Sequence, residues 1–280
     1  MYAIRSSRST LAGYSTHVWQ AGAGHNALVW FPALLDSAHS FGRAALSLHR
    51  KLPPTVRLVA VDPPGYGEST LEPGRAMPSF RSWERWTREL VEHLGSMMHG
   101  RFVFAGNSSG GVAATLAARH AASAAGLLLV CWSDFFDHPA PNVPALCPRD
   151  RGEARRLLGR SWHRPPSVPP LSMDAMLQQT RREDFVSHVA SFDPAVFRLQ
   201  LREVRAPLMV IGGDSDELVP PHAVTTTARR HGGTSEVLRR TGHYPHRESV
   251  PEFTDLVARV VPRWLEETEL PRRMRGRTWR

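Results

Sequence analysis

Cysteine is scarce in this chain of 280 residues, which contains only Cys131 and Cys147. Two cysteines cannot build the disulfide framework of a small secreted protein, so the sequence predicts a protein of the reducing cytoplasm. The two lie 16 positions apart and no His-Glu-x-x-His segment is present, so the spacing of a zinc site is missing and no metal is expected. Cys131 falls in an apolar segment and is expected to be a small buried hydrophobe.

Long apolar runs are also missing. The longest, residues 127–132, has six residues, whereas a membrane-spanning helix needs about 20. The N-terminal segment MYAIRSSRST is polar and lacks the apolar core of a signal peptide. No Gly-x-Gly-x-x-Gly segment follows an expected strand. We therefore expect no membrane attachment, no secretion signal and no nucleotide cofactor.

Lysine is nearly absent. All but one of the 35 basic residues are arginine, the exception being Lys51, and the formal net charge is +9. A basic chain can bind nucleic acid, but an arginine excess of this kind is typical of GC-rich coding. The arginines are scattered except in the last eleven residues, LPRRMRGRTWR, and terminal basic runs are usually solvated tails. Nucleic acid is therefore not an expected partner.

Apolar segments alternate with amphipathic ones along most of the chain. The pattern predicts strands at residues 17–21, 27–31, 56–62, 102–105, 126–132, 208–211 and 235–238, and helices at 37–50, 79–94, 112–122, 221–230 and 250–261. This alternation is typical of a doubly wound, mostly parallel α/β sheet that helices cover on both faces.

A proline-rich segment interrupts this rhythm. Eight prolines fall between residues 139 and 170, and proline disrupts regular helix, so we expect only short helical pieces. We interpret residues 133–200 as an insertion, and residues 1–132 and 201–280 as the core. Apolar side chains of the insertion can cover the core edge or line a pocket: Phe135, Phe136, Leu146, Trp162, Met173, Met176, Leu177, Phe185, Val186, Phe192 and Phe197.

A glycine-flanked serine follows one of the expected strands. The segment Gly106-Asn107-Ser108-Ser109-Gly110 lies between that strand and an alanine-rich helix, which is the setting of a nucleophile elbow. So sharp a turn requires small neighbours, lifts the Ser108 hydroxyl clear of the sheet and directs the Ser109 N–H at the reacting oxygen. The alternative interpretation is a plain strand–helix turn.

A serine nucleophile needs a base, and the base needs an orienting carboxylate. Asp216 and His243 lie in the loops after the last two expected strands, and such loops share one edge of a parallel sheet with the elbow. The sequence therefore predicts Ser108 as nucleophile, Asp216 as acid and His243 as base, in the chain order of this arrangement. Asp214 and Asp134, which also follow strands, are alternative acids.

These segments together resemble the α/β-hydrolase superfamily. The matching pieces are VDPPGYGEST, FVFAGNSSGG, PLMVIGGDSDELVP and TGHYPHRESVPEF, which spread over nearly the whole chain outside the insertion. The resemblance implies the α/β-hydrolase fold, with the insertion as its small cap. It also favours Asp216 as the acid, because the family's carboxylate lies three residues after a glycine. Asn107 is similar to the asparagine of the Gly-Asn-Ser-x-Gly-Gly form found in carbon–carbon bond hydrolases.

The chain departs from the family pattern at the oxyanion hole. The family usually has His-Gly after its third strand, and the residue after that glycine donates its N–H. Here the strand leads into Phe31-Pro32-Ala33, and proline has no N–H and fixes φ near −65°. The resemblance then implies Ala33 and Ser109 as the two donors. Loss of one such donor typically costs about 10²–10³ in rate.

The function predicted from these residues is hydrolysis of a carboxylic ester or thioester through an acyl-enzyme, with a small apolar-to-amphipathic molecule as the expected partner. Two alternatives use the same triad, namely carbon–carbon bond hydrolysis and acyl transfer to an acceptor other than water. A third alternative is a non-catalytic small-molecule receptor, in which Pro32 disables the oxyanion hole.

Overall fold

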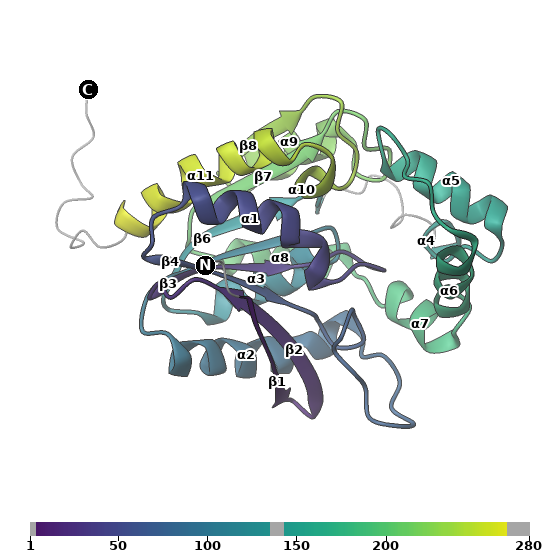
Figure 1. The fold of residues 1–280 in the computed structure, drawn as a ribbon, viewed down its shortest axis with the longest axis horizontal. Coiled ribbons are helices and arrows are strands. Elements are labelled where there is room, and N and C mark those ends of the chain that lie inside the picture. Colours follow the sequence, from purple (N-terminus) through teal and green to yellow (C-terminus); the bar gives the residue numbers. More distant parts are fainter. Residues whose placement is uncertain (1–3, 135–142, 268–280) are drawn as a thin grey trace.

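Eight strands form one sheet at the centre of the protein. The computed structural model describes residues 4–134 and 143–267. The strands are β1 Ile4–Leu11, β2 Tyr14–Ala21, β3 Asn26–Phe31, β4 Val56–Val61, β5 Phe102–Asn107, β6 Ala124–Val130, β7 Leu208–Gly213 and β8 Thr234–Leu238. Their order across the sheet is β1-β2-β4-β3-β5-β6-β7-β8 (Figure 1).

Most of the sheet is parallel. The strands β4, β3, β5, β6, β7 and β8 lie in this order, and each is parallel to the next. Strand β2 is antiparallel to both β1 and β4. The predicted α/β fold with a mostly parallel sheet is therefore confirmed. The antiparallel hairpin at the N-terminal edge was not expected, because β1 (IRSSRSTL) is largely polar and exposed.

Helices cover both faces of the sheet (Figure 1). Their bounds are η1 Ala38–Phe41, α1 Gly42–Lys51, η2 Phe80–Ser82, α2 Trp83–Met97, α3 Gly110–His120, α4 Val143–Leu146, α5 Arg151–Ser161, α6 Pro170–Thr180, α7 Glu183–Ala190, α8 Pro194–Glu203, α9 Pro221–Arg230, α10 Pro245–Glu248 and α11 Val250–Glu267. None of the helices in the described ranges is long and apolar enough to cross a membrane.

Alternate side chains of the central strands enter two separate cores. On β3, Leu28 and Trp30 pack with η1, α1 and α11 on one face. Val29 and Phe31 pack with α2, α3 and α9 on the other face. Successive side chains of a strand point to opposite faces, and all six residues of β3 are buried. The double burial explains why β3 appears in the sequence as a continuous apolar run.

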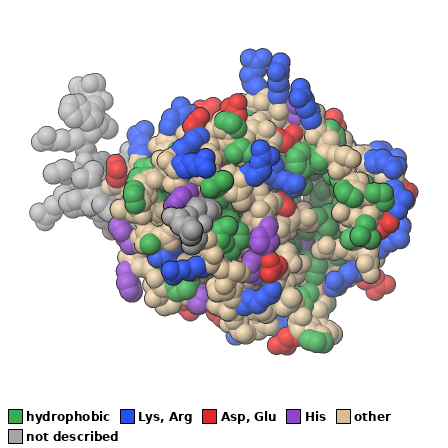
Figure 2. Space-filling view, viewed as in Figure 1, with side chains coloured by type: hydrophobic (Ala, Val, Ile, Leu, Met, Phe, Trp, Pro, Cys, Tyr) green, Lys and Arg blue, Asp and Glu red, His purple; other side chains and the backbone are tan. Residues whose placement is uncertain are grey.

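The segment between β6 and β7 carries α4 to α8. In Figure 1, α4 to α7 lie to one side of the sheet. The predicted boundary between residues 200 and 201 falls inside α8, which packs against α3 and buries Phe197 and Leu201 in the main core. Lys and Arg side chains stand in several separate groups on the face shown in Figure 2. The basic terminal segment and the residues Phe135 and Phe136 lie outside the described residues.

Candidate active site

Ser108 occupies a sharp turn between β5 and α3. Its φ of 50° lies in the left-handed region, which is uncommon for a residue with a side chain. The Ser108 N–H donates to the Val130 carbonyl at 2.8 Å, and the Gly111 N–H donates to the Ser108 carbonyl at 2.8 Å. A Cβ on Gly106 would lie 2.1 Å from the Gly110 carbonyl oxygen, so the turn requires glycine at this position.

Asp216 and His243 are joined by a buried hydrogen bond. Asp216 Oδ2 lies 2.7 Å from His243 Nδ1, and both residues are buried. Asp216 Oδ1 accepts the backbone N–H groups of Leu218 at 2.9 Å and Val219 at 3.0 Å. An ionised carboxylate can only accept hydrogen bonds, so these contacts place the imidazole proton on Nδ1 and leave Nε2 free to take a proton.

The loop of His243 is held from two sides. The His243 N–H donates to the Ser161 carbonyl at the end of α5, at 2.5 Å. The Asn107 amide, next to Ser108 in the elbow, donates to the His243 carbonyl at 3.0 Å and to the Val130 carbonyl at 3.1 Å. The amide nitrogen of Asn107 is thus engaged by two backbone carbonyls, and Asn107 is not among the residues that line the cavity.

Ser108 and His243 line one cavity of about 270 Å³. Within the described part of the chain, the Ser108 hydroxyl makes no hydrogen bond to the His243 ring. Such bonds are often long in active sites without substrate and tighten when substrate binds. The structure therefore brings Asp216 to His243 directly, and brings Ser108 and His243 to the wall of the same cavity.

The two alternative acids have other partners. Asp214 accepts hydrogen bonds from the Ser215 hydroxyl at 2.8 Å and the Thr241 N–H at 3.2 Å. Asp134 is buried and its Oδ2 lies 2.9 Å from Nε2 of His231, which follows the C-terminal end of α9. Burial alone would raise the pKa of the Asp134 carboxyl, but the contacts with His231, Thr227 and Arg230 together outweigh burial and lower that pKa.

Ala33 and Ser109, the predicted oxyanion donors, also line the cavity. Within the described ranges, neither backbone N–H donates a hydrogen bond to the protein, so both are free for a ligand. The elbow and the segment after β3 approach each other closely at Gly110. A Cβ there would lie 2.3 Å from the Phe31 carbonyl oxygen, so the approach requires glycine. Pro32 lies between Phe31 and Ala33 and does not remove the N–H of Ala33.

A tyrosine and a histidine that the sequence did not single out lie beside the elbow. The Tyr66 hydroxyl lies 3.3 Å from Ser109 Oγ and 3.0 Å from Nε2 of His188 in α7. His188 Nδ1 lies 2.6 Å from the Pro78 carbonyl, which can only accept, so Nδ1 carries the proton and Nε2 accepts from Tyr66. Burial, against smaller opposing contributions from Pro78 and Asp184, lowers the pKa of His188 to about 4.

Cys131 is buried, as expected, but it lies against the acid. Its Sγ is within 4.8 Å of the Asp216 carboxylate and the His243 ring, and it donates a weak hydrogen bond to the Gly242 carbonyl at 3.6 Å. Burial, together with the negative charge of Asp216, raises the pKa of this thiol well above its usual range. Cys131 is therefore a neutral thiol that packs beside the Asp216–His243 pair and borders the cavity.

The apolar side chains of the insertion divide between the cavity and the cores. Leu146, Trp162, Met176 and Phe192 line the cavity, with Leu157, Leu158, Val168 and Val189 beside them. Phe185 and Phe197 are buried in the main core. Met173 and Leu177 form a small separate core with Ala154. The periodicity of the sequence could not separate these groups, because both are apolar.

Comparison with known proteins assigns the fold. A model of the alpha/beta hydrolase family matches residues 17–256. A search of curated proteins finds no match. A structure of a protein assigned as a lipase from Acinetobacter baumannii is similar with a TM-score of 0.78 and 19% identity, over 95% of this chain and 93% of that chain.

Two further solved structures have different described activities. A thermophilic esterase from Thermogutta terrifontis is similar with a TM-score of 0.72 and 19% identity, over 93% of this chain and 99% of that chain. A 2-hydroxy-6-oxo-6-phenylhexa-2,4-dienoate hydrolase from Rhodococcus is similar with a TM-score of 0.73 and 16% identity, over 92% and 99%. At these identities the similarity establishes the shared fold.

Proposed function

Because the chain belongs to the alpha/beta hydrolase family, we propose that it is a serine hydrolase of carboxylic esters or thioesters. One observation carries the proposal. Asp216 Oδ2 lies 2.7 Å from His243 Nδ1, and His243 shares its cavity with Ser108 at the left-handed turn. In this proposal Ser108 is the nucleophile, His243 the general base and Asp216 the orienting acid.

The proposed reaction has two halves. Ser108 Oγ attacks the carbonyl carbon while its proton passes to His243 Nε2. The carbonyl oxygen becomes an oxyanion, and the N–H groups of Ala33 and Ser109 donate hydrogen bonds to it. The C–O or C–S bond then breaks, and His243 returns the proton to the leaving alkoxide or thiolate. Water then loses a proton to His243 and attacks the acyl-enzyme; the C–O bond to Ser108 Oγ breaks, and His243 returns the proton to Ser108 Oγ as the acid is released.

The cavity walls favour an apolar-to-amphipathic substrate. Side chains of the insertion supply about half of the apolar lining, and Asp36 and Arg247 add charged groups to it. Arg247 lies 4.8 Å from the ring centre of Trp162 and 3.9 Å from Asp36. An acyl group or ring can fill the apolar part, while the charged groups can contact a polar end.

Two observations favour this proposal over its alternatives. The Ala33 and Ser109 N–H groups are unengaged within the described chain, whereas the receptor alternative requires a disabled hole. The amide of Asn107 supports the His243 loop, so its presence before Ser108 can be explained without a carbon–carbon bond substrate.

Labelling with a fluorophosphonate probe tests the proposal. We expect the purified chain to be labelled on Ser108 and to hydrolyse p-nitrophenyl esters of short fatty acids, and we expect both to disappear in Ser108→Ala. Ser109→Ala is the matched control, because it removes the neighbouring hydroxyl and keeps the backbone N–H. Labelling that persists in Ser108→Ala, or a folded native chain that is not labelled, would contradict the proposal.

A further inference from the structure

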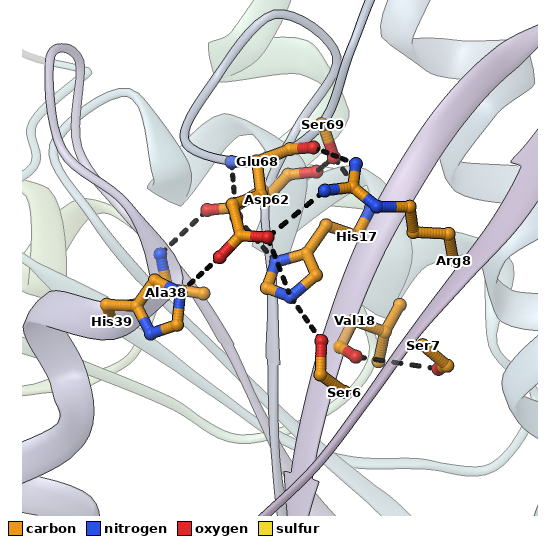
Figure 3. Close-up of polar contacts among 10 residues, drawn as sticks. All are labelled: Ser6, Ser7, Arg8, His17, Val18, Ala38, His39, Asp62, Glu68 and Ser69. Atoms are coloured by element: carbon orange, nitrogen blue, oxygen red, sulfur yellow. Dashed lines mark hydrogen bonds and ion pairs between the residues drawn. The ribbon is translucent and has the colours of Figure 1, made fainter.

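A cluster of side chains that can bind a metal ion lies outside the cavity lining. His17 on β2, His39 in η1 and Glu68 in the loop after β4 point toward one another (Figure 3). Their ligand atoms all lie within 4.8 Å of each other. Glu68 Oε1 is 2.5 Å from His39 Nε2, and Glu68 Oε2 is 4.0 Å from His17 Nε2.

The buried ring of His17 is fixed in one orientation. Its Nδ1 lies 2.8 Å from Asp62 Oδ2, and the same carboxylate accepts the backbone N–H groups of Ala38 at 2.7 Å and Glu68 at 3.0 Å. A carboxylate with these donors accepts the Nδ1 proton, which leaves a lone pair on Nε2, 2.9 Å from the Ser6 hydroxyl and 4.0 Å from Glu68 Oε2. Metal-binding histidines are usually held in this way, by a carboxylate on the other ring nitrogen.

His39 and Glu68 are exposed and can adjust around an ion. Their side chains are 60% and 45% exposed, while His17 is buried. Ligand atoms around tetrahedral zinc lie about 3.3 Å apart, given bond lengths near 2.0–2.1 Å. The present distances from Glu68 of 2.5 and 4.0 Å lie on either side of this value, and the third pair is within 4.8 Å. Rotation of the two exposed side chains can bring these atoms toward the zinc spacing.

Two neighbours compete with an ion for these ligands. Arg8 Nη2 lies 3.1 Å from Glu68 Oε2, and the Ser6 hydroxyl lies 2.9 Å from His17 Nε2. The Ser6 side chain can rotate away because it is exposed. Arg8 can keep its contact with one Glu68 oxygen while the other oxygen binds the ion, although its positive charge weakens binding.

We propose that His17, His39 and Glu68 form a binding site for one divalent transition-metal ion, with zinc the best match. Two imidazoles and one carboxylate are a ligand set that zinc accepts, with water in the fourth position. Imidazole ligands disfavour magnesium and calcium, which prefer oxygen. An ion there would tie β2, η1 and the β4 loop together. That loop also contains Tyr66, which contacts Ser109.

Zinc binding to the full chain tests the site. Protein stripped with a chelator and then desalted would be titrated with zinc chloride by calorimetry, and its Tm measured with and without zinc. We expect one ion per chain and a rise in Tm of about 5 °C when free zinc exceeds Kd a hundredfold. Magnesium chloride should give no such rise.

Variants assign the ion to these residues. His39→Ala and Glu68→Gln, both at exposed positions, should weaken zinc binding more than about tenfold. Matched exposed controls His222→Ala and Glu72→Gln should bind as the native chain does. Arg8→Gln should bind more tightly, because it removes the competing positive charge. Ser108→Ala should bind zinc unchanged, which separates this site from the proposed hydrolase chemistry.

Three results would overturn the proposal. The first is the absence of stoichiometric zinc binding to the native chain. The second is undiminished binding in both His39→Ala and Glu68→Gln. The third is binding that these two variants keep but Cys131→Ser loses, which would place the ion at the Cys131–Asp216–His243 group instead.

Discussion

The side-chain amide of Asn107 donates a 3.0 Å hydrogen bond to the backbone carbonyl of His243, 136 positions later in the chain. The residue before the proposed nucleophile therefore supports the loop of the proposed base. Both groups are buried, so the contact is screened from water. The distance between Ser108 and His243 then depends on a hydrogen bond that neither of their own side chains makes.

We predict that Asn107→Ala lowers kcat about 10- to 100-fold while KM changes less, because a small displacement of a catalytic group can cost 10² in rate. The loss of stability should be about 1–3 kcal/mol, since the carbonyl of His243 is left without a buried partner. Steady-state kinetics and urea unfolding measure the two effects.

Thr115→Ala is the control for Asn107→Ala. The Thr115 hydroxyl is buried and donates to the Gly111 carbonyl within α3 at 2.7 Å. Its loss should destabilise the protein with little change in kcat. Equal losses of kcat in the two variants would mean that Asn107 acts through stability alone.

Replacement of the acid distinguishes Asp216 from the other carboxylates. We predict that Asp216→Asn lowers turnover about 10⁴-fold by analogy with serine proteases, because the imidazole adopts the wrong tautomer. Asp214→Asn should change turnover less than about threefold, as its carboxylate accepts hydrogen bonds from Ser215 and Thr241 and does not contact the His243 ring in the described structure. Turnover of a p-nitrophenyl ester by each folded variant gives the comparison.

Asp134→Asn should act on stability instead of catalysis. Asp134 is buried beside His231 and Arg230, and removal of one partner from a buried ion pair is strongly destabilising. We expect a lower Tm and nearly native turnover at 20 °C. Severe loss of turnover in Asp134→Asn together with an active Asp216→Asn would show that the acid follows β6.

Chain order and strand position were sufficient to predict which loops come together. Asp216 follows the buried strand β7 and His243 follows the edge strand β8, and the edge shared by these parallel strands places the two residues side by side. The edge strand β1 could not be predicted in this way, because its residues are polar and mostly exposed. Strand β1 is defined by its hydrogen-bonded pairing with β2, and the composition of a single segment does not predict such pairing.

Contacts between distant segments outside these loops could not be predicted from the sequence. Tyr66 and His188 are 122 positions apart, and no motif in the sequence includes both residues. The segment VDPPGYGEST, which contains Tyr66, could be recognised in the sequence. The contact of the Tyr66 side chain depends on His188 in α7, and the segment does not predict it. The cavity wall could not be predicted either. Apolar residues of the insertion have the same sequence pattern whether they line the cavity or pack in the core.

The buried His188 predicts a fall in stability at mildly acid pH. Its pKa is about 4 in the folded protein and about 6.5 in an unfolded chain, so between these values the unfolded state binds more protons. Stability therefore rises with pH across this window and falls as the pH drops. The His188 contribution should decrease by about 2 kcal/mol from pH 7 to pH 5.

Urea unfolding at pH 7 and pH 5 measures this contribution. His188→Gln removes the titrating group, so its stability should change less between the two pH values than that of the native chain. His222→Gln, at an exposed site on α9, should retain the native pH dependence. Identical pH dependence in the native chain and His188→Gln would show that His188 is not held neutral by burial.

Met176 tests whether the insertion sets the length of the substrate. Met176 lines the cavity from α6, and the change Met176→Ala should open space for a longer acyl chain. Each methylene in an apolar pocket is worth about 1–3 kcal/mol, or 10- to 200-fold. We therefore expect the kcat/KM ratio of p-nitrophenyl octanoate to the butyrate ester to rise about tenfold. Met97→Ala, at the exposed end of α2, should leave that ratio unchanged, and an unchanged ratio in Met176→Ala would place the acyl chain elsewhere in the cavity.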